Sequence, residues 1–329
     1  MSVLASRDYY KPFQYPWAYE AYKAQSQMHW IPEEIPLKED VNDWALHLNP
    51  SEKNLLTQLF RFFTQADIDV AAGYYEKFLP LFPAPELRMM MGSFAAMEAI
   101  HVDAYSLLLE TVGMPESEYK AFQDYEDMKA KHEYLTSVKS STPHQLGWGK
   151  HAAIEEIARA LAIYSAFGEG LQLFSSFAIL LNFPRHGKMK GMGRVVTWSI
   201  RDETLHVESM IQLFHTLRTE NPDIWTDEFK ATLYQACRDM VELEEKFIDL
   251  AFEMGDMEGL TAAQTKSYIY YIADRRLLQL GLKPHYGVKT SPLPWLDDML
   301  ALSEEVNFFE NRVTEYNKGT IIGDIQWLS

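Results

Sequence analysis

Two Glu-x-x-His pairs lie within long apolar stretches that have the spacing of α-helices. The pairs are Glu98 with His101 and Glu203 with His206. A spacing of three residues puts both side chains on one helix face, where they can bind the same metal ion. One pair alone would be weak evidence, because such pairs are usually ordinary polar contacts on a protein surface. Inside an apolar helix, however, a carboxylate needs a compensating partner.

A single acidic residue precedes each pair, in an earlier apolar segment. Asp67 comes one predicted helix before Glu98, and Glu169 comes one before Glu203. Four such helices supply the ligand set of a carboxylate-bridged dinuclear metal site in a ferritin-like bundle. Four carboxylates balance two divalent ions, and oxygen and nitrogen ligands suit iron or manganese that activates O2. The alternative is a set of unrelated polar residues, each of which would have to be paired or neutralised inside a helix.

The rest of the sequence favours an all-α fold. Apolar residues recur at helical spacing between widely separated prolines and glycines, and no strand pair is evident. We expect Ser51 to be the N-cap of the helix that carries the first lone acid. We also expect one charged helix over residues 117–138, an apolar helix over residues 151–182 that Pro184 ends, and a helix opened by the capping box Thr261–Gln264.

The helical pattern fades after residue 282. We therefore expect a helical bundle over residues 1–282 and a mobile C-terminal tail over residues 283–329. The tail ends in hydrophobic residues that include Trp327 and Leu328.

Composition limits the classes of partner and the chemistry of the site. The formal net charge of −17 would repel phosphate backbones, and no basic patch is evident, so we expect no nucleic-acid binding. Cys237 is the only cysteine, so the chain alone offers no disulfide, and any metal would be held by oxygen and nitrogen. Charged residues near the N-terminus, such as Arg7 and Lys11, argue against a signal peptide, and the uncharged stretch between Glu169 and Arg185 is shorter than the roughly 20 residues that span a bilayer. We expect a cytoplasmic protein that does not enter a membrane.

The motifs resemble those of the small, radical-generating subunit of class I ribonucleotide reductase. The resemblance extends from about Trp30 to Tyr316, and its most specific parts are Glu98-Ala99-Ile100-His101 followed by Tyr105, and Arg201-Asp202-Glu203-Thr204-Leu205-His206. It implies a set of metal ligands made of Asp67, Glu98, His101, Glu169, Glu203 and His206. It also implies that Tyr105 is oxidised to a stable radical when the reduced metals react with O2.

The resemblance further implies a path for the oxidising equivalent. Trp30 and Asp202 would link the metal site to the surface, and Tyr316 in the tail would pass the equivalent to a cysteine of a separate large subunit. Ribonucleotides would be reduced to deoxyribonucleotides on that partner, on which the hydrophobic tip of the tail would dock, while two small subunits would pair as a homodimer. Each chain would hold two metal ions, with iron as the first choice and manganese or a mixed manganese–iron pair as alternatives.

One position departs from what the resemblance leads us to expect. The family tends to surround its radical tyrosine with apolar groups, which keep water and reductants away from the radical. At the matching positions Leu173 and Phe177 fit this rule, whereas Ser199 does not. All six ligands and the tyrosine are present, which argues against the branches of the family that lack the metal or the tyrosine.

Two other functions are compatible with a dinuclear site in a helical bundle. A ligand-binding oxidase of the same bundle type would use the site on a fatty-acid-like substrate, but most such relatives have glutamate where this chain has Asp67. A storage protein of ferritin type would be shorter and would assemble into shells. The tail that contains Tyr316 favours the reductase subunit over both.

Overall fold

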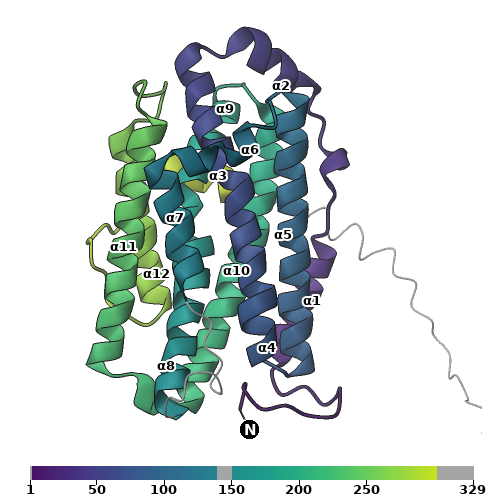
Figure 1. Cartoon of the computed structure of the whole chain (residues 1–329), viewed down its shortest axis with the longest axis vertical. Helices are drawn as coiled ribbons and strands as arrows, with labels where there is room; N and C mark the ends of the chain where they lie inside the picture. Colours follow the sequence, from purple (N-terminus) through teal and green to yellow (C-terminus); the bar gives the residue numbers. More distant parts are fainter. Residues whose placement is uncertain (1, 139–149, 302–329) are drawn as a thin grey trace, which may run out of the picture. The chain divides into compact units, whose positions relative to one another are not determined.

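The computed structural model describes residues 2–138 and 150–301, and all elements named within these ranges are helices (Figure 1). A single isolated bridge, between Met257 and Leu260, is the only β-type pairing among the described residues. The predicted all-α class is therefore confirmed. The chain has two compact units, Met1–Leu293 and Pro294–Ser329. The predicted division into a bundle and a docking tail stays a prediction, and Tyr316 and the hydrophobic tip lie outside the described residues.

Four helical segments of the first unit bear the predicted ligands. They are α3 (Pro50–Ala72), α5 (Pro85–Thr111), η5 (Ala162–Gln172) and α10 (Lys190–Glu220). Helix α3 packs against α5, while α10 packs against both α5 and η5. Figure 1 shows α3, α5 and α10 running alongside one another. The ligand-bearing faces of these helices are buried.

Helix α3 begins at Pro50, one residue earlier than expected, so the expectation that Ser51 caps it is wrong. Asn49 is the N-cap: its side chain accepts a hydrogen bond of 2.9 Å from the backbone N–H of Glu52, whose carboxylate accepts one of 2.9 Å from the backbone N–H of Asn49. Pro50 occupies the first helical position, where its missing N–H costs nothing. A proline there also keeps the preceding residue extended, which makes that residue the cap.

The charged helix predicted over residues 117–138 is broken into shorter pieces. The pieces are α6 (Glu118–Ala121), the 3₁₀ turn η4 (Phe122–Asp124) and α7 (Glu126–Ser137). The break falls at Tyr125, whose φ of −108° and ψ of 114° are those of an extended residue. Charge and periodicity alone gave no signal for this change of backbone conformation.

The apolar segment predicted over residues 151–182 is one helical run whose central part is a π-helix. It consists of α8 (Lys150–Leu161), the π-helical η5 and α9 (Phe174–Arg185). Pro184 lies inside α9 and does not end it; the chain leaves the helix at Gly187, whose φ is +79°. By length and hydropathy the stretch Ala152–Arg185 could cross a membrane, but the apolar window is 100% buried within the protein, as expected of a core helix.

The remaining helices complete the bundle. They are α1 (Pro16–Gln27), η1 (Pro32–Glu34), α2 (Lys38–Asn42), η2 (Asp43–His47), η3 (Gly73–Phe78), α4 (Leu79–Leu81), η6 (Pro222–Ile224), α11 (Asp227–Ala251) and α12 (Ala262–Gln279). The capping box predicted at Thr261 and Gln264 is present at the start of α12. Helix α1 packs against α5 and α10, and so places Gln25 on the outer side of the ligand helices.

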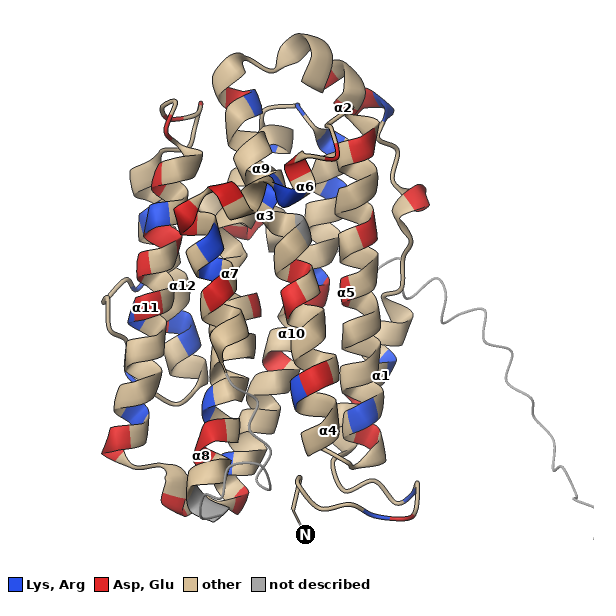
Figure 2. Ribbon diagram, viewed as in Figure 1, with Lys and Arg blue, Asp and Glu red and all other residues tan. Residues whose placement is uncertain are grey.

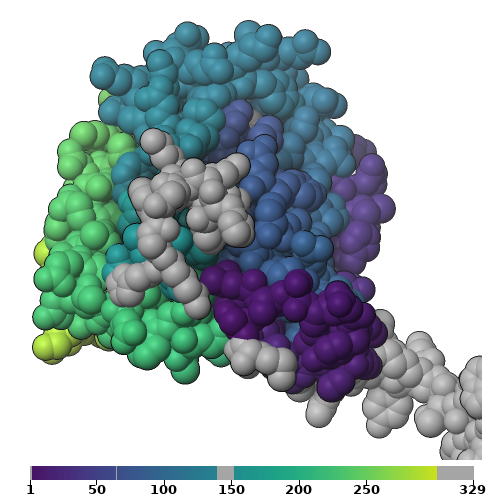
Figure 3. Space-filling model, turned by 60° about the horizontal axis from the view of Figure 1, so that its bottom comes forward, coloured from purple at the N-terminus to yellow at the C-terminus, as the bar shows by residue number. Residues whose placement is uncertain are grey.

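The N-terminal segment is tied to one end of α10. The backbone N–H of Val3 and the hydroxyl of Tyr15 each donate a hydrogen bond of 2.8 Å to the carboxylate of Glu220. Figure 3 shows these first residues, in purple, on the end of the molecule turned toward the viewer.

In Figure 2 basic and acidic residues are interspersed along the helices, and no basic stripe is seen in that view of the described residues.

Candidate metal centre

The six predicted ligands form two groups that share Glu98. Within each group, one potential ligand atom from every residue lies within 4.8 Å of the others. The groups are Glu98, Glu169, Glu203 and His206, and Asp67, Glu98 and His101. All six side chains are at most 2% exposed. Sequence spacing therefore identified residues that four separate helical segments bring into one buried cluster.

Both histidines turn the same ring nitrogen toward the carboxylates. Nδ1 of His101 lies 3.3 Å from an oxygen of Glu98 and 3.3 Å from an oxygen of Glu203. Nδ1 of His206 lies 2.9 Å from Oε1 of Glu98 and 3.7 Å from Oε2 of Glu203. Glu98 and Glu203 thus lie next to both imidazoles, as carboxylates that bridge two ions would.

The facing atoms lack ordinary hydrogen-bond partners. The buried atoms without such a partner among the described residues include Asp67 Oδ2, Glu98 Oε1, Glu98 Oε2, His101 Nδ1, Glu203 Oε2 and His206 Nδ1. Such close approaches without hydrogen-bond geometry leave buried lone pairs unsatisfied, at a cost of several kcal/mol for each charged group. Metal ions would satisfy them all, since the donors are the carboxylate oxygens and imidazole nitrogens that iron and manganese accept. The residues therefore fit a dinuclear metal centre.

Without metal ions, the negative charge of the clustered carboxylates is reduced by shifts in their pKa values. Burial raises the pKa of Glu169 to about 7 and the pKa of Asp67 well above its usual range. Although burial opposes it, His101 and His206 lower the pKa of Glu98 to about 2. Four buried carboxylates cannot all stay ionised without cations beside them, so protons would take the place of the metal ions.

Asp202 lies between the cluster and Trp30. Its Oδ2 atom lies 3.2 Å from Nε2 of His101 and accepts a hydrogen bond of 2.8 Å from the indole of Trp30. Its other oxygen, Oδ1, accepts a hydrogen bond of 3.2 Å from the adjacent Arg201, with which it forms a salt bridge. With Nε2 protonated and directed to Asp202, Nδ1 of His101 keeps its lone pair for a metal ion.

Sequence reasoning missed Gln25. Its side-chain oxygen lies 3.0 Å from Nε2 of His206, and its amide nitrogen donates to Oδ1 of Asp202 at 3.4 Å. Gln25 therefore binds the outer ring nitrogen of His206, as Asp202 binds that of His101. It also joins these two outer contacts, because its amide is hydrogen-bonded to Asp202. No spacing rule singles out one glutamine in a polar helix, so the sequence contained no usable signal for it.

Sequence reasoning also missed Tyr74. The hydroxyl of this buried tyrosine donates a hydrogen bond of 2.6 Å to Oε1 of Glu169. Tyr74 lies seven residues after Asp67, two helical turns further along the same helical run. That spacing was an available signal for a residue near the metal centre, although 18 tyrosines made it a weak one.

Tyr105 lies in an apolar environment broken by one hydroxyl. Its ring centroid is 4.7 Å from that of Phe63, which in turn is 5.5 Å from that of Phe177. Its hydroxyl donates to Oγ of Ser199 at 3.4 Å, while Ser199 donates to the backbone oxygen of Val195. Burial raises the pKa of the Tyr105 phenol, so the side chain stays neutral. The aromatic neighbour of Tyr105 is thus Phe63, which the sequence analysis did not name, and Ser199 lies at its hydroxyl.

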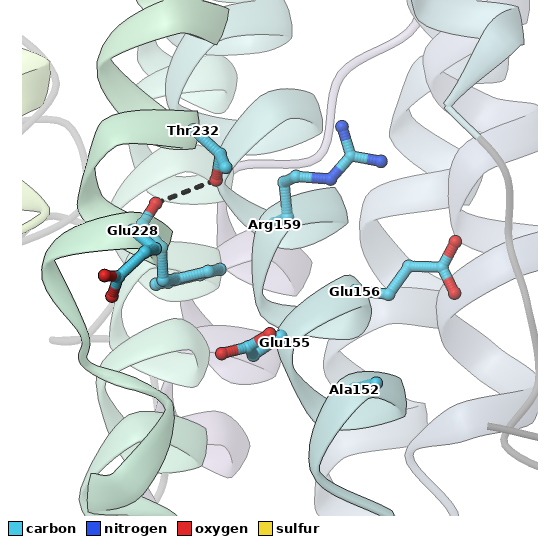
Figure 4. A pocket seen from close by; sticks show the side chains of 7 residues that line it. Ala152, Glu155, Glu156, Arg159, Glu228 and Thr232 are labelled. Carbon is cyan, nitrogen blue, oxygen red and sulfur yellow. Dashed lines mark hydrogen bonds between the residues drawn. The ribbon is translucent and has the colours of Figure 1, made fainter. Parts of the chain in front are cut away.

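An acidic pocket between α8 and α11 is separate from the cluster. It has a volume of about 390 Å³ and shares no lining residue with the predicted ligands. Figure 4 shows its charged side chains, which are Glu155, Glu156, Arg159 and Glu228. The described residues of its lining include no histidine, and a group of acids on a helix surface is ordinarily solvated. The dinuclear cluster is therefore the candidate functional site.

The sequence matches known proteins over nearly its whole length. The family described as ribonucleotide reductase, small chain, matches residues 7–292. A probable ribonucleoside-diphosphate reductase small subunit of Invertebrate iridescent virus 6 is 47% identical, with 97% of this chain and 98% of the relative covered. The ribonucleoside-diphosphate reductase subunit beta of Chlamydia pneumoniae is 30% identical, with 96% of this chain and 91% of the relative covered.

Solved structures of lower identity share the fold. The R2 subunit of Clostridium botulinum ribonucleotide reductase has a TM-score of 0.82 at 24% identity, over 91% of this chain and 94% of that one. The dimanganese(II) NrdF of Streptococcus sanguinis has a TM-score of 0.74 at 19% identity, over 88% and 96%. The Rnr4 homodimer of Saccharomyces cerevisiae has a TM-score of 0.73 at 21% identity, over 96% and 92%.

These matches decide between the three functions that the sequence left open. They favour the reductase subunit over a ligand-binding oxidase and over a storage protein, and they agree with the buried cluster of carboxylates and histidines. The chain belongs to the ribonucleotide reductase small-chain family and is the small subunit of a ribonucleoside-diphosphate reductase, an oxidoreductase.

Proposed function

We propose that this chain generates a radical on Tyr105 at a dinuclear metal centre and supplies it to a large subunit that reduces ribonucleotides. The proposed ligands are Asp67, Glu98, His101, Glu169, Glu203 and His206. The observation that carries the proposal is the convergence of buried ligand atoms that have no hydrogen-bond partner among the described residues. When bound, a reduced pair of iron or manganese ions would supply the electrons that reduce O2 and the oxidising power that the phenol requires.

The surroundings of Tyr105 suit a radical that persists. The phenol is 1% exposed, and its ring packs on Phe63, which in turn packs on Phe177. Because burial raises its pKa, Tyr105 remains a neutral phenol until it is oxidised. It must therefore lose its hydroxyl proton together with the electron, and the first group that its hydroxyl meets is Ser199.

The contacts of Asp202 support the proposed relay. Trp30, Asp202 and His101 form a continuous hydrogen-bonded path in which Asp202 Oδ2 is the shared acceptor. Trp30 also lies against Trp198, with ring centroids 5.2 Å apart. We propose that this path carries the oxidising equivalent out of the cluster, and that Tyr316 passes it on to the large subunit.

We propose iron in both metal positions. Manganese, alone or mixed with iron, is the alternative that the same ligands accept, and the Streptococcus sanguinis relative is a dimanganese(II) form. The oxygen and nitrogen ligand set excludes neither metal, so the choice must be made by analysis of the purified protein.

The proposed assembly is a homodimer that works with a large subunit in the cytoplasm. Small subunits of this family act with a large subunit, and the yeast relative is described as a homodimer. The net charge of −17 supports the proposal that neither nucleic acid nor an anionic membrane is a partner. Removal of residues 316–329 should abolish turnover with the large subunit and leave metal binding unchanged; full turnover by the truncated protein would contradict the proposed tail.

The deciding experiment is low-temperature electron paramagnetic resonance. Metal-free protein is loaded with Fe(II), exposed to O2 and frozen, and a tyrosyl signal is expected. The same protein with Tyr105→Phe is the control, and the signal should be absent from it. Iron binding without any tyrosyl signal in the wild type would contradict the proposed use of iron and Tyr105.

A further inference from the structure

Tyr74 contacts the cluster from η3, the π-helical segment that directly follows α3. Its hydroxyl donates a hydrogen bond of 2.6 Å to Oε1 of Glu169, and the same oxygen lies 3.7 Å from Nδ1 of His206. Glu169 and His206 belong to one of the two ligand groups, and Tyr74 belongs to neither. Tyr74 is thus a neutral hydrogen-bond donor that contacts a predicted ligand directly.

The position of Tyr74 is fixed by two π-helical segments that meet beside the cluster. Tyr74 lies in η3 and Glu169 lies in η5. A Cβ atom on Gly73 would come within 2.7 Å of the Tyr164 ring, so a glycine at this position lets η3 approach η5 closely. π-Helical turns within helices often occur at functional sites.

Aromatic neighbours hold the Tyr74 ring on its other sides. Its centroid lies 6.0 Å from that of Phe94 and 6.2 Å from that of His206, both in edge-on arrangements. Phe94 itself packs on His206, with centroids 4.3 Å apart. Tyr74 is 2% exposed, so its hydroxyl cannot exchange Glu169 for bulk water without moving the surrounding helices.

The two ligand groups differ in the donors around their carboxylates. Glu169 receives the Tyr74 hydroxyl, whereas Oδ2 of Asp67 has no hydrogen-bond partner among the described residues. We propose that Tyr74 is a positioning residue that orients the Glu169 carboxylate and thereby sets the affinity of one of the two metal positions. This inference rests on the proposed dinuclear centre and adds a reason why its two positions are unequal.

Loss of the Tyr74 hydroxyl should weaken one position selectively. Hydrogen bonds to ligand side chains hold them in the orientation that binds metal, and their removal typically lowers metal affinity by about 10-fold to 100-fold. Tyr74→Phe removes only the hydroxyl and keeps the ring that packs on Phe94. We expect an affinity loss of about tenfold at one metal position and no change at the other.

Tyr164→Phe is the matched control. Tyr164 is another buried tyrosine that lines the same narrow space as Tyr74 and Glu169. Its hydroxyl donates to the backbone oxygen of Leu135 at 2.8 Å and contacts Lys77, but no predicted ligand. The control variant therefore loses a buried hydroxyl from the same region without loss of a ligand contact.

The test is isothermal titration of metal-free full-length protein with MnCl2, without a redox step. Co(II) absorption in the visible range provides a spectroscopic readout of ligand geometry on the same three proteins. We expect Tyr164→Phe to bind two ions with the same two affinities as the wild type. We expect Tyr74→Phe to bind one of the two ions more weakly and to show an altered Co(II) spectrum. Binding and spectra identical to the wild type would overturn the role of Tyr74, as would equal weakening of both positions or the same effect in Tyr164→Phe.

The outcomes separate this inference from the proposed function. Failure of the wild type to bind two ions would contradict the dinuclear centre itself, whereas two ions in the wild type and no change in Tyr74→Phe would contradict only the role of Tyr74. Should Tyr74→Phe not fold, 3-fluorotyrosine at position 74 keeps the hydroxyl and reports by ¹⁹F resonance. Its ¹⁹F signal should shift when Zn(II) binds at one of the two metal positions and should not shift when Zn(II) binds at the other. A signal that neither Zn(II) ion shifts would overturn the inference.

Discussion

The indole nitrogen of Trp30 donates a hydrogen bond of 2.8 Å to Oδ2 of Asp202, so two side chains far apart in the sequence are in direct contact inside the protein. The same oxygen faces His101, which faces the cluster through its other nitrogen. The carboxylate of Asp202 thus connects Trp30 to the predicted metal ligand His101. Loss of its indole should break the path without removing a ligand.

Trp30→Phe should therefore separate radical formation from turnover. We expect the variant to bind metal and to form the Tyr105 radical, because Asp202 keeps its contact with His101. We expect turnover with the large subunit to be lost, because phenylalanine offers no N–H to Asp202. Radical content by electron paramagnetic resonance and deoxyribonucleotide formation, measured on the same preparation, check both parts.

The neighbouring Trp198 gives the control for that experiment. It packs against Trp30 with ring centroids 5.2 Å apart, but the contact of Trp30 with Asp202 does not involve it. Trp198→Phe should keep the hydrogen-bonded path. Full turnover in the Trp30 variant would refute the relay, and equal losses in both variants would show that packing rather than the hydrogen bond is responsible.

Tyr105→Phe should leave the metal centre intact. The phenol makes a single long hydrogen bond, of 3.4 Å to Ser199, and its ring packing is retained by phenylalanine. We expect an unchanged metal content by elemental analysis, a melting temperature close to that of the wild type, and no tyrosyl signal after Fe(II) and O2. An identical signal in the variant would assign the radical to another residue.

Ser199→Ala should change the character of the radical. The Ser199 hydroxyl is the hydrogen-bond partner of the Tyr105 hydroxyl, and by turning away from the Val195 backbone oxygen it can donate a hydrogen bond to the oxidised oxygen. Without that donor we expect a longer radical lifetime and a shifted g-value at high field, because a hydrogen bond withdraws spin density from the phenoxyl oxygen. Unchanged lifetime and g-values would show that Ser199 does not bind the radical.

Much of the metal centre could be predicted from the sequence because its ligands follow helical spacing. Glu98 with His101 and Glu203 with His206 are local pairs, and their apolar surroundings indicated that they are buried. The structure brings both pairs together with Asp67 and Glu169 in one buried cluster. Their roles as ligands remain to be tested by metal binding.

The parts that could not be predicted depend on contacts between distant segments. Gln25 reaches His206 only because α1 packs across α5 and α10. Tyr74 reaches Glu169 because two helical runs widen into π-helices, and helical periodicity assumes a regular α-helix. The N-cap at Asn49 was missed for a local reason, since the proline after it outweighed the better-known preference for serine.

A buried ion pair outside the cluster allows a prediction about stability and pH. Lys131 of α7 contacts Glu244 of α11; both side chains are 0% exposed, and the ammonium lies 4.0 Å from the centroids of Phe62 and Phe247. Removal of the lysine leaves a carboxylate buried without its cation. We expect Lys131→Met to lower the free energy of unfolding by about 3–5 kcal/mol at neutral pH. Urea denaturation of the metal-free protein measures the change.

The pH dependence of that loss follows from the sign of the pKa shift. Burial raises the pKa of Glu244, and Lys131 opposes the rise, so the pKa of Glu244 should rise further in the variant. An acid with a raised pKa binds its proton more tightly in the folded state, so its folded form is favoured at low pH. The deficit should be smallest below about pH 4, near the ordinary pKa of glutamate, and should grow as pH rises through the raised pKa.

A double variant tests whether the buried charge causes the loss. Lys131→Met combined with Glu244→Gln removes both charges and keeps an acceptor for the Ser175 hydroxyl, which donates to Glu244. Because replacing a whole buried pair by neutral groups is often nearly neutral, the double variant should recover most of the lost stability and lose the pH dependence. If it stayed as unstable as Lys131→Met at every pH, lost packing of the lysine stem against Phe62 and Phe247 would be the cause instead.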